Sequence, residues 1–74
     1  MLYLFFMNTL FELAKERKTE VVGRYGGRNL SKMLKISHPA VSKWIVVPPY
    51  RAYQISKFGD FDMDYLRPDL KAVE

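Results

Sequence analysis

Apolar positions recur at helical spacing in the middle of the chain. Two groups follow the i, i+3, i+4 pattern, one at Leu30, Met33 and Leu34 and one at Ala40, Val41, Trp44 and Ile45. The pattern predicts two short helices that face each other through these stripes, with Ile36 filling the turn between them. The turn also carries signals for the start of the second helix. Ser37 is placed to accept from free backbone N–H groups, and Pro39 suits a first helical turn.

The opposite side of the second helix is polar and basic. If Val41 and Trp44 face inward, four side chains are left toward solvent: His38, Pro39, Ser42 and Lys43. A short, rigid helix with such a face is the form that a helix-turn-helix inserts into the major groove of DNA. We therefore expect a helix-turn-helix over about residues 28–45.

The segment before it also has a helical pattern. Thr9 and Glu12 form a capping box, which predicts a helix from Leu10. Its buried side would hold Leu10, Leu13 and Ala14, and the stripe resumes at Val21, Val22 and Tyr25. Because Arg17 and Lys18 interrupt this stripe, either one helix runs to Tyr25 or the chain begins a new helix at Thr19. Gly26 and Gly27 should end it in a left-handed conformation.

Two further helices are expected after the central pair. Val46 to Pro49 should be extended, since residues before proline avoid the helical region. A helix from Pro49 through Phe58 would bury Ala52, Ile55 and Phe58, and Gly59 would end it. Asp62 should cap a one- or two-turn helix that carries Met63 and Leu66, which Pro68 would stop. Arg67 and Asp69 are expected to be structural partners.

Residues 1–8 form an apolar N-terminal extension. The run from Met1 to Met7 is too short to span a bilayer and lacks the features of a signal peptide. Three interpretations stay open: a segment packed on the domain, a dimer contact, or a start site assigned too early, with Met7 as the true start.

Composition and charge favour an anionic partner. The 74 residues predict a single domain over 1–74, and 49% hydrophobic residues are enough to fold it. Without cysteine there are no disulfides, which suits the cytoplasm. The net charge is +4, and the positive charge is concentrated between residues 15 and 57, around the predicted helix-turn-helix.

The sequence gives little support for a metal site, a catalytic site or a surface that stacks bases. Asp60, Asp62 and Asp64 resemble the start of a calcium loop, but Tyr65 stands where glycine is required and Lys71 where glutamate is required. His38 is the only histidine, and the serines lack an orienting base and carboxylate. We therefore expect no cofactor, no metal site, no enzymatic activity and no membrane partner. The tyrosines at 50, 53 and 65 are read as core or rim residues, so binding of single strands or RNA is weakly supported.

The residues from Leu30 to Trp44 resemble the helix-turn-helix of Cro-like phage regulators, including the YdaS-type repressor and antitoxin proteins. The Leu66-Arg67-Pro68-Asp69-Leu70 segment is similar to the ending of that group, and with Tyr25-Gly26-Gly27 the resemblance covers about residues 19 to 71. Its start near Thr19 favours a break in the first helix. Two positions depart from the pattern: Lys35 replaces the usual turn glycine, at a cost of about 1 kcal/mol in a left-handed turn, and His38 replaces the usual glutamine.

The resemblance implies an all-α domain of about five helices and a sequence-specific regulator of transcription, bound as a homodimer to a double-stranded DNA operator. It places His38, Pro39, Ser42 and Lys43 at the positions that read base edges. Seven residues are candidates for contacts with the DNA backbone: Arg28, Asn29, Lys32, Lys35, Ser37, Arg51 and Lys57. The alternative is an antitoxin or antirepressor that acts on a protein partner through its apolar N-terminus.

Overall fold

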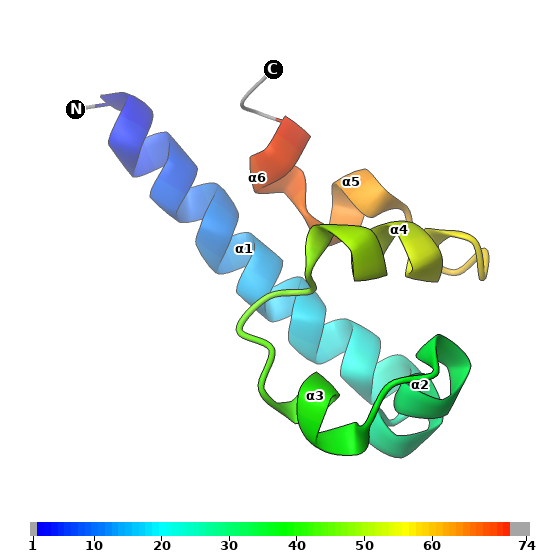
Figure 1. The fold of residues 1–74 in the computed structure, drawn as a ribbon. Helices are drawn as coiled ribbons and strands as arrows, with labels where there is room; N and C mark the ends of the chain where they lie inside the picture. Colours follow the sequence, from blue (N-terminus) through cyan, green and yellow to red (C-terminus); the bar gives the residue numbers. More distant parts are fainter. Residues whose placement is uncertain (1, 72–74) are drawn as a thin grey trace.

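A computed structural model describes residues 2–71 of the chain, with side chains for residues 5–70. Six helices follow one another: α1 (Leu2–Tyr25), α2 (Gly27–Leu34), α3 (His38–Ser42), α4 (Pro49–Ser56), α5 (Met63–Leu66) and α6 (Pro68–Lys71). Figure 1 shows α1 as a long rod with α2 and α3 gathered at its C-terminal end, while α5 and α6 lie along its side. The fold is therefore all-α, as expected, and residues 2–71 hold six helices where about five were predicted.

One apolar core joins these helices. Its buried members are Val21, Leu30, Leu34, Val41, Val47, Ala52, Ile55 and Leu66. Each of the helices from α1 to α5 contributes at least one of these side chains, and Val47 comes from the segment between α3 and α4. Because this segment carries a core residue, the exit of the chain from α3 is tied to the rest of the molecule.

The first helix is longer and straighter than the sequence patterns predicted. The predicted helix start with a capping box at Thr9 was wrong, because α1 begins at Leu2. The Thr9 hydroxyl donates to the Phe5 carbonyl oxygen at 2.9 Å inside the helix. Of the two alternatives for the following segment, one continuous helix to Tyr25 is confirmed and a break at Thr19 is wrong, since the Thr19 hydroxyl donates to the Lys15 carbonyl oxygen at 3.5 Å within the same helix. Threonine inside a helix satisfies its hydroxyl in this way. Residues 2–8 are thus part of α1.

Arg17 explains how α1 stays continuous through its polar interruption. Its guanidinium carbon lies 3.7 Å from the centre of the Tyr65 ring, and Nη1 donates to the Tyr65 carbonyl oxygen at 2.7 Å. Leu10 and Leu13 are half-buried, and Ala14 is fully buried. Arg17 therefore faces α5, where Tyr65 supplies a ring and a carbonyl group for it.

Glycine 26 turns the chain from α1 directly into α2. Its φ is positive, at 84°, but its ψ of 137° lies outside the left-handed helical region that was predicted. Its N–H donates to the Val22 carbonyl oxygen at 2.7 Å, and its carbonyl oxygen accepts from the Leu30 N–H at 2.8 Å. One residue therefore ends α1 and begins α2, a conformation that glycine adopts at little cost.

Several end residues differ from expectation. Ile45 lies beyond α3 and is 67% exposed, so it does not belong to the buried stripe. Met33 and Phe58 are each 37% exposed, and Phe58 meets the Tyr25 ring edge-on.

The two ends of α5 also differ from expectation. Asp62 precedes α5 but makes no side-chain cap. Pro68 begins α6 and does not merely stop α5. These residues lie at helix ends, where the choice between core and solvent depends on neighbouring helices.

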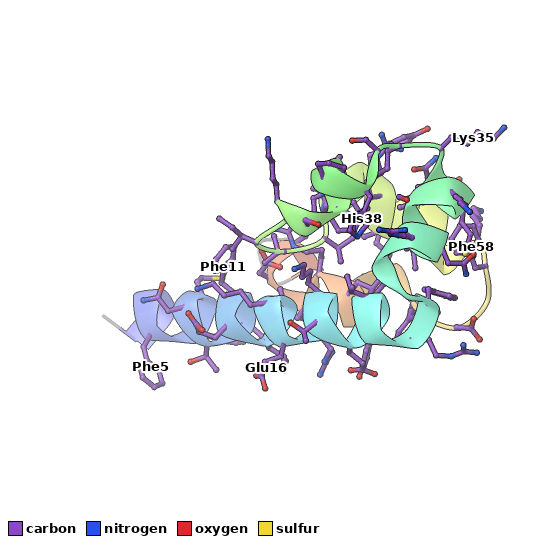
Figure 2. The ribbon with its side chains drawn as sticks, turned by 90° about the horizontal axis from the view of Figure 1, so that it is seen from below. Phe5, Phe11, Glu16, Lys35, His38 and Phe58 are labelled. Atoms are coloured by element: carbon purple, nitrogen blue, oxygen red, sulfur yellow. The ribbon has the colours of Figure 1, made fainter. Side chains whose placement is uncertain are left out.

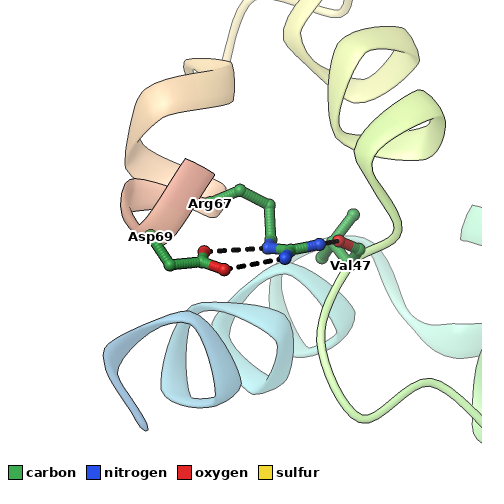
Figure 3. A network of polar contacts seen from close by, with 3 residues as sticks. All are labelled: Val47, Arg67 and Asp69. Atoms are coloured by element: carbon green, nitrogen blue, oxygen red, sulfur yellow. Dashed lines mark hydrogen bonds and ion pairs between the residues drawn. The ribbon is translucent and has the colours of Figure 1, made fainter. Parts of the chain in front are cut away.

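The predicted pairing of Arg67 with Asp69 is confirmed. Nε and Nη2 of Arg67 donate to the two carboxylate oxygens of Asp69 at 3.0 Å and 2.8 Å, as Figure 3 shows. Both side chains are buried. This bidentate pair ties the first turn of α6 to Arg67, the residue just before the helix, with charge-assisted hydrogen bonds.

Candidate nucleic-acid interface

The turn between α2 and α3 is closed by backbone hydrogen bonds. Lys35 adopts the left-handed conformation at φ 60° and ψ 44°, in the position where the related pattern carries glycine. The N–H of Ile36 donates to the Ser31 carbonyl oxygen at 2.9 Å, and that of Lys35 donates to the Lys32 carbonyl oxygen at 3.2 Å. Carbonyl groups at the end of α2 are thereby satisfied. Lysine in place of glycine therefore preserves the turn. It also places a positive charge on the outer edge of the turn, which Figure 2 shows.

Ser37 begins α3 as predicted. Its backbone is extended, and its hydroxyl accepts a hydrogen bond from the Ala40 N–H at 3.3 Å. Pro39 occupies the first turn of the helix, where its missing N–H leaves no hydrogen bond unmade. Local chemistry therefore determines where this short helix starts.

The two sides of α3 separate as the apolar pattern indicated. Val41 is 1% exposed, and Trp44 packs half-buried against the core just beyond the helix. The four predicted base-reading side chains are all exposed: His38, Pro39, Ser42 and Lys43. Ser42 donates its hydroxyl proton to the His38 carbonyl oxygen at 3.2 Å, and Lys43 is the C-cap residue, one position beyond α3.

Five of the seven predicted backbone contacts lie close to this face. Arg28, Asn29, Lys32, Lys35 and Ser37 are exposed residues of α2 and the turn. The N-terminus of α2 has no side-chain cap, since Gly26 precedes it. Uncapped N–H groups at a helix start favour an anion.

The remaining two candidates belong to α4 and its C-cap. Arg51 is half-buried and donates from Nη1 to the Gln54 Oε1 atom at 2.6 Å. Lys57 is exposed, with Nζ 4.8 Å from the centre of the Tyr53 ring. Helix α4 contacts α2 but not α3 within the described residues. The structure therefore places these two side chains on an element that packs against α2 but does not contact α3.

Two basic side chains of α1 are paired with carboxylates. Lys15 pairs with Glu12 at 3.0 Å, and Arg24 lies 3.6 Å from Asp60. Tyr25 donates to the other oxygen of Asp60 at 2.8 Å, and burial together with this hydrogen bond raises the pKa of Tyr25 to about 12. The positive charge around α2 and α3 is thus distinct from the paired charges of α1.

An acidic hollow lies on another part of the surface. Its volume is about 330 Å³, and its lining residues are Glu20, Asp60, Phe61, Asp62 and Tyr65. Three carboxylates repel phosphate, so this side of the molecule does not suit DNA. Among residues 2–71, no group of three or more histidine, aspartate or glutamate side chains is arranged to hold a metal ion.

Two contacts near the candidate site could not be predicted from helical periodicity. Gly27 lies against the side chain of His38, and Arg67 reaches the backbone of the segment that follows α3. The partners lie 11 and 20 residues apart, respectively. Helical periodicity compares residues three or four positions apart, so it does not report such contacts.

A family model described as DNA-binding transcriptional regulator Cro matches residues 17–63, from the second half of α1 to the first residue of α5. No curated protein and no solved structure matches the chain. Among the described helices, none has both the length and the apolar character needed to cross a membrane.

Proposed function

Since the chain belongs to the Cro family of phage-type DNA-binding transcriptional regulators, we propose that it binds a double-stranded operator with sequence preference through the exposed face of α3. The observation that carries this proposal is the division of α3 and its C-cap between core and solvent. Val41 is buried while His38, Ser42 and Lys43 are exposed on a helix that Ser37 and Val47 hold in place. Such a helix presents side chains to base edges with little freedom to rearrange.

The exposed side chains offer distinct chemistry to a base pair. Lys43 donates to guanine O6 or N7, and His38 donates or accepts according to its tautomer. Ser42 is a permissive reader, because a hydroxyl both donates and accepts. A bidentate base contact discriminates by about 1–3 kcal/mol, and these single contacts contribute less. Specificity from one copy is accordingly modest.

Modest specificity per copy favours binding as a homodimer. Two copies related by a two-fold axis would read half-sites about 34 Å apart, which is one turn of the DNA helix. A second copy doubles the number of base contacts without requiring a longer α3. The DNA in question would lie in the bacterial cytoplasm, or in the host cell if the gene is carried by a phage.

The electrostatic part of binding is assigned to α2 and the turn. Arg28, Lys32 and Lys35 are exposed there, and the uncapped start of α2 adds backbone donors. With about 4–6 phosphates neutralised per copy, log K should fall against log salt with a slope of about −4 to −5. Arg51 and Lys57 would add to this slope only where the DNA backbone reaches α4.

The test is a titration of the protein against the DNA upstream of its own gene and against random duplex, at several salt concentrations. We expect a steep slope on both, with tighter binding and a symmetric footprint on the upstream DNA. Lys43→Ala should weaken the preference, whereas Lys15→Ala removes the same charge far from α3 and serves as the matched control. Equal affinity for both DNAs at every salt concentration would contradict the proposal.

The alternative, neutralisation of a protein partner, would use the first turns of α1. Phe5 is 72% exposed and points away from the other helices, as Figure 2 shows. The family match does not favour this function over DNA binding. Binding that is insensitive to salt and to DNA, but is lost in Phe5→Ser, would support it.

A further inference from the structure

Gly27, the first residue of α2, lies directly beneath the side chain of His38. A β-carbon placed on Gly27 would come within 2.9 Å of Nε2 and 3.2 Å of Cδ2 of His38. Figure 2 shows the imidazole of His38 lying beside the start of α2. The space that any other residue would fill at position 27 is therefore already occupied by the ring.

The backbone does not demand glycine at this position. Gly26 and Gly59 have positive φ angles of 84° and 96°, and no atom lies within 4 Å of where their β-carbons would be. Gly27 is the reverse case: it lies within α2 and its φ is not positive, but its missing side chain faces His38. Alanine is favoured over glycine in a helix, so the reason for glycine here is the neighbouring ring.

We propose that Gly27 is a positioning residue for His38, and that it sets the direction in which the imidazole is presented to the DNA. The proposal rests on the proposed function, because it assigns a role within the same reading face. The backbone of His38 is fixed by the Ser37 cap and by the closed turn. Contact with α2 at Gly27 then restricts the remaining freedom, which is the rotation of the ring.

The consequence concerns recognition more than stability. A methyl group at position 27 would displace the far end of a flexible, exposed side chain, and such a shift costs the fold little. A hydrogen bond to a base edge tolerates only a narrow range of distance and angle. Moving the ring by a few tenths of an ångström would therefore alter one base contact while the helices stay in place.

The experiment compares Gly27→Ala with Gly23→Ala, a matched control. Gly23 is an exposed residue of α1, and no atom lies within 4 Å of its missing β-carbon. Neither variant should unfold at a lower temperature than the wild type. Gly27→Ala should weaken operator binding about two- to tenfold and change the preference at one base pair per half-site. Gly23→Ala should bind like the wild type.

The His38→Ala background decides the mechanism. If Gly27 acts through the ring, adding Gly27→Ala to His38→Ala should cause no further loss of affinity. An equal loss of affinity in the wild-type and His38→Ala backgrounds would overturn the proposal, because it would mean that the methyl group blocks phosphate at the start of α2. An unchanged operator affinity of the Gly27→Ala variant would overturn it as well.

Failure of the proposed function would look different. The wild type would then show no preference for its upstream DNA, and the reading role of His38 would fall with it. A nuclear Overhauser effect between Gly27 Hα and the His38 ring in the free protein tests the contact by itself. Its absence would overturn the positioning role even if DNA binding were demonstrated.

Discussion

Arg67 donates a hydrogen bond from Nη1 to the carbonyl oxygen of Val47, 2.9 Å away and 20 residues earlier in the chain. Val47 belongs to the segment that leads from α3 to α4, and Arg67 lies between α5 and α6. Figure 3 shows that the same guanidinium also holds Asp69. One buried side chain thus connects the C-terminal helices to the exit of the candidate recognition helix.

Arg67→Ala should lower the free energy of unfolding by about 3–5 kcal/mol, because it leaves the Asp69 carboxylate buried without its partner. That is a large part of the roughly 4–11 kcal/mol expected for a chain of this length. Arg67→Lys keeps the charge but loses the two-pronged geometry, so a smaller loss is expected. Urea unfolding followed by Trp44 fluorescence measures both, and a change below about 1 kcal/mol for Arg67→Ala would contradict this account.

Acid should weaken the fold through Asp69. Hydrogen bonds from Arg67 hold the pKa of Asp69 below its ordinary value of 3.8. A lowered carboxyl pKa contributes stability above the unfolded pKa, and the contribution is lost as pH falls through the folded pKa. The urea concentration at half-unfolding should therefore decrease as the pH falls below about 4. Asp69→Asn should flatten that part of its pH profile. An identical acid profile for the variant would assign the effect to other carboxylates.

Alkaline pH should act through Tyr25. Its pKa is raised from 10.0 to about 12, first by burial and then by the hydrogen bond to Asp60. A raised pKa contributes stability that is complete below the unfolded value and is lost as pH rises between these two values. Tyr25→Phe keeps the ring against Phe58 and Phe61 but removes this dependence. Unfolding midpoints measured from pH 9 to 12 should fall less steeply for the variant than for the wild type.

Ser37 and Thr9 should respond oppositely to alanine. Ser37 caps α3, so Ser37→Ala should cost about 1 kcal/mol. Thr9 lies inside α1 and its hydroxyl bonds to the preceding turn, so Thr9→Ala should be neutral or slightly stabilising. Thermal unfolding of the two variants provides the comparison. A loss of about 1 kcal/mol for Thr9→Ala would mean that a helix does start there.

Lys43 and Trp44 are neighbours with separate expected roles. Trp44→Ala should destabilise by about 2–3 kcal/mol, below the range for a fully buried tryptophan because the ring is only half-buried. Lys43→Ala should leave the unfolding midpoint unchanged and weaken operator binding. Circular dichroism and a DNA titration on each variant separate the two effects. Wild-type operator affinity in both variants would contradict the assignment of Trp44 to the core and of Lys43 to the DNA-facing side.

Local residue chemistry was enough to predict the centre of the fold. The apolar spacing of Leu30, Leu34 and Val41 and the Ser37 cap appear in the structure as expected, and Lys35 is left-handed at the position where the resemblance to the Cro-like pattern implied such a turn. Each of these features depends on residues within a few positions of one another. Helix starts, tight turns and apolar stripes arise from such short-range interactions, so they can be recognised in one sequence.

The same short-range signals misled where a distant group decided the outcome. Thr9 fits a capping box, and Arg17 interrupts an apolar stripe, but α1 runs straight through both. The ring and carbonyl group that receive Arg17 belong to Tyr65, 48 residues later. Ile45 has the spacing of a core residue, but α3 has already ended before it.

Sequence alone determined that this protein is an all-helical chain with a central helix-turn-helix, whose second helix has a polar face and is followed by Lys43. Tertiary structure decided how far α1 extends, which basic residues are already paired, and which side chain lies against Gly27. The reason is physical: a helix start or a turn depends on neighbours along the chain, whereas the partners of Arg17, Arg67 and Gly27 are brought together only when the helices pack.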